Sequence, residues 1–485
     1  MRSKRQNNQL ELALGTAVRG EAPNGRAGGT EGGMARPGVE GSAAPPRGIG
    51  GLMEAIVARD NLKKALAQVK RNKGAPGVDG MTVENLTPYL KEHWSAIRAQ
   101  LLDGTYRPQP VRRVEIPKAT GGTRALGIPS LPRRRPGVLD RFIQQAVLQV
   151  LQGEWDGTFS ASSYGFRPGR SAHQAVARAQ EYIAAGRRWV VDIDLEKFFD
   201  RVNHDLLVGL VAKRVFDKRV RRLIRGYLTA GVLADGLVGP TDEGTPQGGP
   251  LSPLLSNLML DGLDKELERR GHRFVRGACP RAGRRPDPWA DDCNIYVQSR
   301  RAGERVMVSV EPFLTGRLKL KVNKAKSAVA RPNARKFLGF SFTSEIAPRR
   351  RIAPQALTRF VSRVRQLTRR TKGRSLEQTI ECLSVYLTGW RGYFGFCQTA
   401  SVLRDLDGWV RRRLRSLAWA QWRSGRRRYR ALRHHGISMR LAATTAAAAR
   451  AHGPWRLSRH PVLQAALPMT FFASHGLPTL APAAA

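Results

Sequence analysis

Trp289-Ala-Asp-Asp-Cys-Asn-Ile-Tyr-Val297 places two adjacent acids, Asp291 and Asp292, directly before a run with strand character. A third acid, Asp194, follows the β-branched run Trp189-Val-Val-Asp-Ile193. Neighbouring side chains of a strand point to opposite faces, so adjacent acids are best presented together at a hairpin turn. Three carboxylates that converge there repel one another unless divalent cations lie between them. Because two metals about 3.5–4 Å apart are a recurring device for phosphoryl transfer, the stretch predicts that chemistry.

The acid pair has a simpler explanation when it is taken alone. Adjacent aspartates are common as turn residues and as helix caps. The strand-like run after the pair, together with Asp194 upstream, favours a shared site. Asp192 lies two residues before Asp194 and therefore shares its strand face. It is either a further metal ligand or, as we favour, a polar residue at a sheet edge.

The chain is strongly basic. Its 485 residues contain 83 Lys and Arg against 38 Asp and Glu, which gives a formal net charge of +45. An excess of this size indicates a polyanionic partner, and nucleic acid is the leading candidate. A ribosome-associated or histone-like protein is the alternative. Apolar residues make up 41% of the chain, so it is expected to fold, into about three units, rather than remain a disordered polycation.

Cysteine usage and hydropathy predict a cytoplasmic protein. The four cysteines, Cys279, Cys293, Cys382 and Cys397, contain no Cys-x-x-Cys pair, which fits a reducing compartment and indicates neither a disulfide framework nor a zinc site. No apolar run approaches the roughly 18 residues of a membrane span. Residues 1–50 are rich in Gly, Ala, Arg and Pro and contain no signal-peptide core, so they predict a disordered basic leader.

A loop of unusual composition, Gly244-Thr-Pro-Gln-Gly-Gly-Pro-Leu-Ser-Pro253, lies between the two acidic segments. Gln247 at its centre can both donate and accept hydrogen bonds. Glycines without a Cβ let a nucleotide approach the backbone closely. The alternative is a simple loop before a helix, since Leu254-Leu-Ser-Asn-Leu-Met-Leu260 has helical character, but the composition favours a functional loop.

Two cations, Lys118 and Arg124, flank the glycine-containing turn of a predicted hairpin. Together they could hold a triphosphate, Arg through bidentate contacts and Lys as a point charge. In a chain this basic, two solvated loop cations are an equal alternative. No Gly-x-x-x-x-Gly-Lys-[Ser/Thr] motif is present, so a P-loop ATPase is not supported.

Beyond about residue 350 the sequence becomes helical and more basic. Leu406, Val410, Leu414 and Leu417 form one apolar stripe at helical spacing. Aromatic residues interleave with arginines, as in Trp390-Arg-Gly-Tyr-Phe394. Such aromatics can stack on unpaired bases, although we expect about half of them to belong to the core. The last dozen residues are expected to be frayed.

Taken together, these motifs resemble those of the reverse transcriptase/maturase encoded by bacterial group II introns. The match runs from about residue 52 to 465 and is specific because many motifs occur in order. In chain order the motifs are Tyr164-Gly-Phe-Arg-Pro-Gly-Arg170, Asp194 with Phe198-Phe199, Gly244-Thr-Pro-Gln-Gly-Gly-Pro250, Ala290-Asp-Asp292, Asn323-Lys-Ala-Lys-Ser327, Phe337-Leu-Gly-Phe340, Leu387-Thr-Gly-Trp-Arg-Gly-Tyr-Phe394 and Leu406-Asp-Gly-Trp-Val-Arg-Arg-Arg-Leu414.

The resemblance implies an α+β fold of the right-hand polymerase type, with fingers, a palm on an antiparallel sheet and a thumb, followed by a helical maturase region. It divides the chain into a disordered basic leader (1–50), fingers and palm (51–345), a helical thumb/maturase or X domain (346–435) and a basic C-terminal tail (436–485). No cluster of Cys pairs and His follows residue 397, so the family's optional metal-dependent endonuclease domain is expected to be absent.

The function implied by the resemblance is RNA-templated DNA synthesis by a nucleotidyltransferase of a mobile element. Asp194, Asp291 and Asp292 would be the catalytic acids that hold two Mg²⁺ ions. Lys118 and Arg124 would hold the triphosphate of the incoming dNTP. The other two dNTP contacts would be Phe199, which excludes a 2′-hydroxyl, and Gln247, which borders the nascent base pair. The implied partners are intron RNA, whose splicing the thumb and tail assist, a DNA primer and target DNA.

Two segments depart from the family pattern. The Arg-rich segment 131–137 is an apparent insertion in the fingers. Residues 277–288 separate the strand Phe274-Val-Arg276 from the acid pair, and Trp289 stands where the family has Tyr. We expect this second insertion to displace the first strand of the hairpin, and Trp289 to crowd the primer end. The alternatives are therefore a splicing factor with impaired catalysis, or a reverse transcriptase of another system such as a retron, against which the maturase-like residues 387–422 argue.

Overall fold

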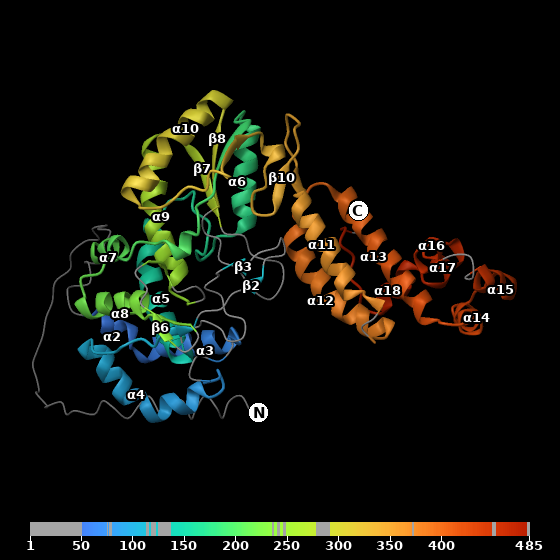
Figure 1. The fold of residues 1–485 in the computed structure, drawn as a ribbon, viewed down its shortest axis with the longest axis horizontal. Helices are drawn as coiled ribbons and strands as arrows, with labels where there is room; N and C mark the ends of the chain where they lie inside the picture. Colours follow the sequence, from blue (N-terminus) through green and yellow to red (C-terminus); the bar gives the residue numbers. More distant parts are fainter. Residues whose placement is uncertain are drawn as a thin grey trace, which may run out of the picture. The chain divides into compact units, whose positions relative to one another are not determined.

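The computed structural model divides the chain into two compact units, coloured along the sequence in Figure 1. One contains residues up to 159, 196–262 and 315–321, and the other contains 160–195, 263–314 and 322 onward. The structure describes residues 51–74, 76, 80–112, 116–117, 123–124, 137–234, 237–239, 243–245, 249–277, 292–370, 373–448 and 453–482. The predicted leader (1–50) lies outside the described residues.

The first unit is mainly helical. Its core forms around α5 (Val138–Trp155), whose first turns are buried on every side, and α3 (Arg59–Arg71) packs along this helix. The helix predicted near 138–152 is therefore confirmed. The other described helices that lie wholly within this unit are α2 (Leu52–Ile56), α4 (Leu86–Asp103), α7 (His204–Ala212) and α8 (Lys218–Thr229), with the short 3₁₀ helices η1 (Asp156–Thr158) and η2 (Phe198–Asp200).

Five short strands accompany these helices. In one sheet, β1 (Val111–Arg112) pairs in parallel with β5 (Val232–Ala234), which pairs antiparallel with β6 (Leu237–Gly239). In the other, β2 (Ile116–Pro117) pairs antiparallel with β3 (Thr123–Arg124).

The second unit is built on a four-stranded antiparallel sheet with the order β7-β8-β4-β9. The strands are β7 (Arg273–Gly277), β8 (Asp292–Val297), β4 (Trp189–Ile193) and β9 (Ala328–Ala330). In Figure 1 the helices α6 (Ala172–Ala184) and α10 (Arg300–Pro312) lie on either side of this sheet, and both contact its strands. The long helix α9 (Ser252–Arg269) leads into β7.

Successive side chains of β4 point to opposite faces of the sheet, one face packing against α6 and the other against α10. Val190 belongs to the same core cluster as the apolar face of α6. Val191 points the other way, toward Gly303 of α10. A Cβ on Gly303 would lie 2.5 Å from the side chain of Val329, so a glycine at this position lets α10 approach the sheet closely.

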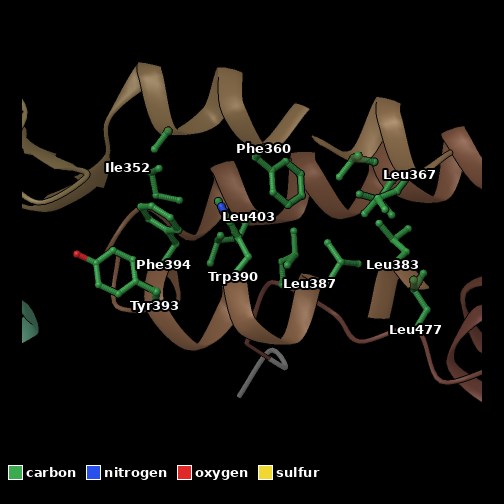
Figure 2. Close-up of a cluster of buried hydrophobic side chains, with 14 of the residues drawn as sticks. Ile352, Phe360, Leu367, Leu383, Leu387, Trp390, Tyr393, Phe394, Leu403 and Leu477 are labelled. Atoms are coloured by element: carbon green, nitrogen blue, oxygen red, sulfur yellow. The ribbon is translucent and has the colours of Figure 1, made fainter. Parts of the chain in front are cut away.

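The chain then passes through the hairpin β10 (Phe340–Phe342) and β11 (Arg350–Ile352) into the helices α11 (Pro354–Leu367), α12 (Leu376–Phe394) and α13 (Ala400–Gln421). Figure 2 shows the apolar cluster between them, where the ring of Phe360 lies 4.5 Å from that of Trp390, centroid to centroid. The predicted stripe on α13 is confirmed: Val410, Leu414 and Leu417 are buried and Leu406 packs against the same core.

Short helices complete the chain: α14 (Gly425–His434), α15 (Met439–Ala447), α16 (Pro454–Leu457), α17 (Pro461–Ala466) and α18 (Met469–Ser474). The expectation that the last dozen residues are frayed is wrong for those that the structure describes. Leu480 is 1% exposed. The backbone N–H groups of Leu480 and Ala481 donate to the carboxylate of Asp407 on α13, at 2.9–3.0 Å. These hydrogen bonds and this burial fasten the end of the chain to the helical core.

None of the described helices combines the length and the apolar character that crossing a membrane requires.

Candidate active site

The sheet register brings two of the predicted acids together. In the β4–β8 pair, Ile193 lies opposite Cys293 and Asp192 lies opposite Asn294. Continued by one residue, the same register places Asp194 across from Asp292. Residues directly opposite in an antiparallel pair lie on the same face, so both carboxylates belong to one face of the sheet. Asp291 lies outside the described residues.

One carboxylate oxygen of Asp194 lacks the partners that buried oxygens normally have. The side chain is 21% exposed, and Nζ of Lys326 lies 3.3 Å from its Oδ2. This Oδ2 is shielded from solvent and accepts no hydrogen bond from the described residues. Buried polar atoms are almost always hydrogen-bonded, so an exception marks a position where another group is expected. A carboxylate oxygen in this state fits a hard divalent cation such as Mg²⁺.

The described residues contain no group of three or more His, Cys, Asp or Glu side chains that could hold a metal ion. With Asp291 outside the described part of the chain, Asp292, the first residue of β8, and Asp194, which directly follows β4, are the predicted ligands with a known position. The predicted three-acid site therefore stays a prediction, supported by the register of these two acids.

A turn formed by Asn323-Lys-Ala-Lys-Ser327 holds the backbone of Asp194. The N–H of Asn323 donates to the carbonyl oxygen of Asp194 at 2.8 Å. The N–H of Asp194 donates to Oγ of Ser327 at 3.0 Å. From the sequence this segment was only one of several matching motifs, and its contact with Asp194 was not predicted. The motif could be recognised in the sequence, but its hydrogen bonds to Asp194 are apparent only in the folded structure.

Asp192 shares the strand face of Asp194, as predicted, but it does not lie at a sheet edge. Strand β4 has β8 on one side and β9 on the other, so the edge prediction is wrong. The carboxylate accepts hydrogen bonds from Nε and Nη2 of Arg335, at 2.8 and 2.5 Å. Burial raises the pKa of Asp192 above its usual range, and Arg335 opposes this shift. Asp192 thus accepts hydrogen bonds from a guanidinium of the protein, whereas the ammonium group of Lys326 lies near Asp194 Oδ2 without a hydrogen bond.

The loop that contains Gln247 begins against the segment that contains Phe199. The N–H of Thr245 donates to the carbonyl oxygen of Phe199 at 2.7 Å, and Nε2–H of His204 donates to that of Gly244 at 2.6 Å. Gly244 has a φ of +94°, and a Cβ there would lie 2.9 Å from the Phe199 carbonyl oxygen, so glycine is required. The ring of Phe199 is buried. Gln247 lies outside the described residues.

One member of the predicted cation pair, Arg124, lies on strand β3. This strand pairs antiparallel with β2, with Ile116 opposite Arg124. Lys118 lies outside the described residues, and so does the side chain of Arg124. Their contact with a triphosphate stays a prediction.

Arg276 fixes the start of the acidic hairpin. Its guanidinium is fully buried and donates to both oxygens of Asp264 on α9, at 2.7–3.0 Å, and to Oγ of Ser163 at 2.7 Å. Its backbone also bonds to Ser162 and Tyr164, at the start of the loop that resembles the template-side motif. Sequence reasoning missed this buried ion pair, because the two charges look like ordinary surface residues.

The insertion does not displace the first strand of the hairpin. Strand β7 pairs with β8 without a break from Arg273 opposite Tyr296 to Gly277 opposite Asp292. The expectation of a displaced strand is therefore wrong. Residues 278–291 and the Arg-rich segment up to residue 136 lie outside the described residues.

In the helical region, several aromatics predicted as base-stacking candidates are core residues. Trp390 and Trp419 are 2% and 1% exposed. Trp455, not singled out from the sequence, is 36% exposed and lies under the guanidinium of Arg412, 3.8 Å from ring centroid to Cζ. Exposed guanidinium–aromatic pairs of this kind suit nucleic-acid contact better than the buried tryptophans do.

Two family models match the chain. Residues 116–342 match "Reverse transcriptase (RNA-dependent DNA polymerase)", and residues 357–436 match "Group II intron, maturase-specific domain". The two matched segments follow one another along the chain, as the sequence motifs do.

Among curated proteins, the chain is 34% identical over 311 residues to protein YkfC of Escherichia coli (strain K12), which covers 58% of this chain and 80% of that protein. It is 39% identical over 206 residues to the group II intron-encoded protein LtrA of Lactococcus lactis subsp. cremoris, which covers 42% of this chain and 33% of LtrA. The chain thus spans most of the first relative and about a third of the second. A solved partial Cas6-RT-Cas1–Cas2 complex is similar at 23% identity and a TM-score of 0.33, covering 55% of this chain and 43% of that chain.

Proposed function

Because the chain belongs to the family of group II intron reverse transcriptase/maturases, we propose that it is an RNA-directed DNA polymerase that also binds its intron RNA and assists splicing and mobility. The observation that carries the polymerase half is the β4–β8 register, which has Ile193 opposite Cys293 and, continued by one residue, would set Asp194 across from Asp292. The maturase half rests on the domain that follows the polymerase domain. Its substrates and partners are intron RNA, a DNA primer, dNTPs and target DNA.

In this proposal the sheet β7-β8-β4-β9 is the palm, and the hairpin β2–β3 belongs to the fingers. Helices α11 to α14 form the thumb and maturase region, and those from α15 onward lie in the basic C-terminal tail. The assignment is supported by the order of the motifs and by the antiparallel pairing of the strands that carry the acids. Each strand and helix named in this assignment lies within one of the two compact units. Helix α9, which is not part of the assignment, has residues in both units.

Asp194, Asp291 and Asp292 would hold two Mg²⁺ ions. When bound, the ions would supply activation of the primer 3′-hydroxyl and charge stabilisation of the pyrophosphate leaving group. Oδ2 of Asp194 supports this role, because it is shielded from solvent and accepts no hydrogen bond from the described residues, although the Lys326 ammonium group lies 3.3 Å from it. The turn 323–327 keeps the Asp194 backbone in place, so the carboxylate is oriented before substrate arrives.

The remaining predicted residues would act on the incoming dNTP. Lys118 and Arg124 would bind its triphosphate, as an ammonium point charge and a bidentate guanidinium. Phe199 would exclude a 2′-hydroxyl by its bulk. Gln247 would border the nascent base pair. The hydrogen bond between Thr245 and Phe199 supports a shared site for the last two, because it fixes the start of the Gln247 loop against the Phe199 backbone.

Primer extension tests the polymerase. The full chain is assayed with Mg²⁺ on poly(rA)/oligo(dT), with Asp291→Ala as the control. We expect incorporation of dTTP by the unmodified protein and loss of incorporation in the variant. Incorporation no greater than that of Asp291→Ala would reject the polymerase and leave the splicing factor. The unbroken β7–β8 pairing favours the active enzyme over that alternative.

A splicing assay at near-physiological Mg²⁺ tests the maturase. The precursor RNA contains the group II intron from which the coding sequence derives. We expect faster splicing with the protein than without it, and a binding affinity that falls steeply as salt rises, because phosphate contacts release counterions. Equal splicing rates with and without protein would reject the maturase role.

A further inference from the structure

We propose that the ammonium group of Lys326 and a divalent cation compete for the same oxygen of Asp194. Lys326 balances the charge of this carboxylate while no cation is bound, and it moves aside when one binds. The inference rests on the proposed function, because Asp194 is the acid assigned there to the metal. Lys326 would then set how much free Mg²⁺ the enzyme needs.

The contact that carries the inference is specific to one oxygen. Nζ of Lys326 lies 3.3 Å from Oδ2 of Asp194, the atom that is shielded from solvent and has no hydrogen bond to the described residues. The contact is therefore an ion pair without the directional bond that would strengthen it. A divalent cation that coordinates Oδ2 has to take the place that this ammonium group occupies.

Hydrogen bonds hold the backbone of the turn around Lys326, whereas its side chain is largely exposed. The N–H of Lys326 donates to the carbonyl oxygen of Asn323 at 3.1 Å, and its own carbonyl oxygen accepts from Nη2 of Arg335 at 2.5 Å. Ser327, the next residue, is hydrogen-bonded to Asp194. The Lys326 side chain, by contrast, is 62% exposed. The ammonium group can therefore leave Asp194 for water while the turn keeps the carboxylate in position.

The neighbouring acids show why Asp194 needs such a counter-charge. Asp192, two residues before Asp194, already has a cationic partner in Arg335. Asp292 lies across from Asp194 in the sheet register. Several carboxylates on one face repel one another, so Asp194 gains from a cation at all times. A lysine suits this exchange better than an arginine, because its single ammonium group makes no bidentate bond to release.

Lys324 provides a matched control within the same turn. Its Nζ lies 2.8 Å from Oε1 of Glu311, and its side chain is 79% exposed. A change at Lys324 removes the same charge from the same turn without touching Asp194. The comparison of the two lysines therefore separates competition for one oxygen from a general change in local potential.

The test is a Mn²⁺ titration of the full chain followed by electron paramagnetic resonance of the free ion. The variants are Lys326→Gln, Lys326→Met, Lys324→Gln and Asp194→Asn. We expect both Lys326 variants to bind Mn²⁺ about threefold more tightly, the effect of losing one partly exposed ion pair. Lys324→Gln should change the affinity by less than about 1.5-fold, because its partner is elsewhere. Asp194→Asn should weaken binding by tenfold or more, as expected for a lost coordinating oxygen.

The outcomes distinguish this inference from the proposed function. An unchanged Mn²⁺ affinity in both Lys326 variants overturns the competition, and so does an equal tightening in Lys324→Gln. Unchanged Mn²⁺ binding in Asp194→Asn instead overturns the assignment of Asp194 as a metal ligand. Circular dichroism of each variant checks the fold, and two different Lys326 replacements guard against a misfolded protein.

Discussion

Carboxylates in the helical region and on α9 differ in their hydrogen bonding from the carboxylate that follows strand β4. In the helical region, Asp407 accepts three hydrogen bonds from the backbone of Leu480 and Ala481. On α9, the two carboxylate oxygens of Asp264 accept hydrogen bonds from Nε and Nη2 of Arg276. Directly after β4, Oδ2 of Asp194 accepts no hydrogen bond from the described residues, and Nζ of Lys326 lies 3.3 Å from it.

This difference in hydrogen bonding distinguishes carboxylates that stabilise the fold from a carboxylate that serves the proposed chemistry. A buried carboxylate with full hydrogen bonding holds elements together, and removing it leaves the donors unsatisfied. A buried carboxylate with an unsatisfied oxygen costs free energy, and it persists where that oxygen serves another purpose. Substitution of the two kinds should therefore give opposite results, with loss of activity at Asp194 and loss of stability at Asp264 and Asp407.

The largest expected effect is that of Asp194→Asn on polymerisation. The change removes the negative charge but keeps the shape, so we expect primer extension to fall by about 10³-fold, as for loss of a principal electrostatic group in other enzymes. The free energy of unfolding should stay the same or rise, because the charge removed lies partly on an oxygen that is shielded from solvent and accepts no hydrogen bond from the described residues. Primer extension and urea unfolding of the same preparation measure the two effects. A variant that loses stability and activity in parallel would show that Asp194 is structural.

The next effect is that of Asp264→Leu on stability. The change leaves the fully buried guanidinium of Arg276 without its partner, and breaking a buried pair in this way costs about 3–5 kcal/mol. We expect a lower urea midpoint and loss of soluble protein on heating. The double variant Asp264→Leu with Arg276→Met removes both charges and should recover much of the loss. If the double variant is no better than the single one, the cost comes from packing and not from the unpaired charge.

A smaller loss of stability is expected for Asp407→Ala. The change leaves the N–H groups of Leu480 and Ala481 without an acceptor, at a cost of about 2 kcal/mol. The end of the chain should then become accessible to carboxypeptidase, while primer extension is retained. The matched control is Asp405→Ala, which removes an exposed acid from the same helix. Equal digestion of the two variants would contradict the role of Asp407.

Local sequence patterns predicted the elements that carry the site, but not the long-range contacts that hold it. The strand before Asp194, the strand after the acid pair and the helix at 138–155 all follow from the period and composition of short segments. The sequence gives no sign that Ser327 bonds to Asp194 or that Arg276 pairs with Asp264, because both contacts depend on which strands become neighbours. The same reason explains the error at Asp192, whose central position follows from the pairing of β9 with β4.

The displaced strand was a different kind of error. An insertion between two strands was expected to disturb their pairing, yet β7 keeps its register up to Gly277. The physical reason lies in Arg276, whose backbone and side chain bind elements other than the hairpin partner. A strand that is fixed from both sides tolerates a long connection, because loop closure costs grow slowly with length.

The smallest expected effect is a pH dependence at a third carboxylate with full partners, Asp217, in the first unit. Burial by itself raises the pKa of Asp217, but hydrogen bonds from the side chain and N–H of Arg219 and from the N–H of Met53 outweigh it, so the pKa is lowered. A folded-state pKa below the unfolded value of about 3.9 contributes stability at higher pH that is lost as the pH falls through the folded pKa. Between pH 5.5 and pH 3, the urea midpoint of the unmodified protein should therefore fall further than that of Asp217→Asn, which has no charge to lose. Asp205→Asn is the control, because Asp205 is 80% exposed and its ion pair with Arg225 contributes little. Equal changes of the urea midpoint with pH in the two variants would show that the donors around Asp217 do not stabilise its charged form. Full hydrogen bonding would then not by itself distinguish a structural carboxylate from a functional one.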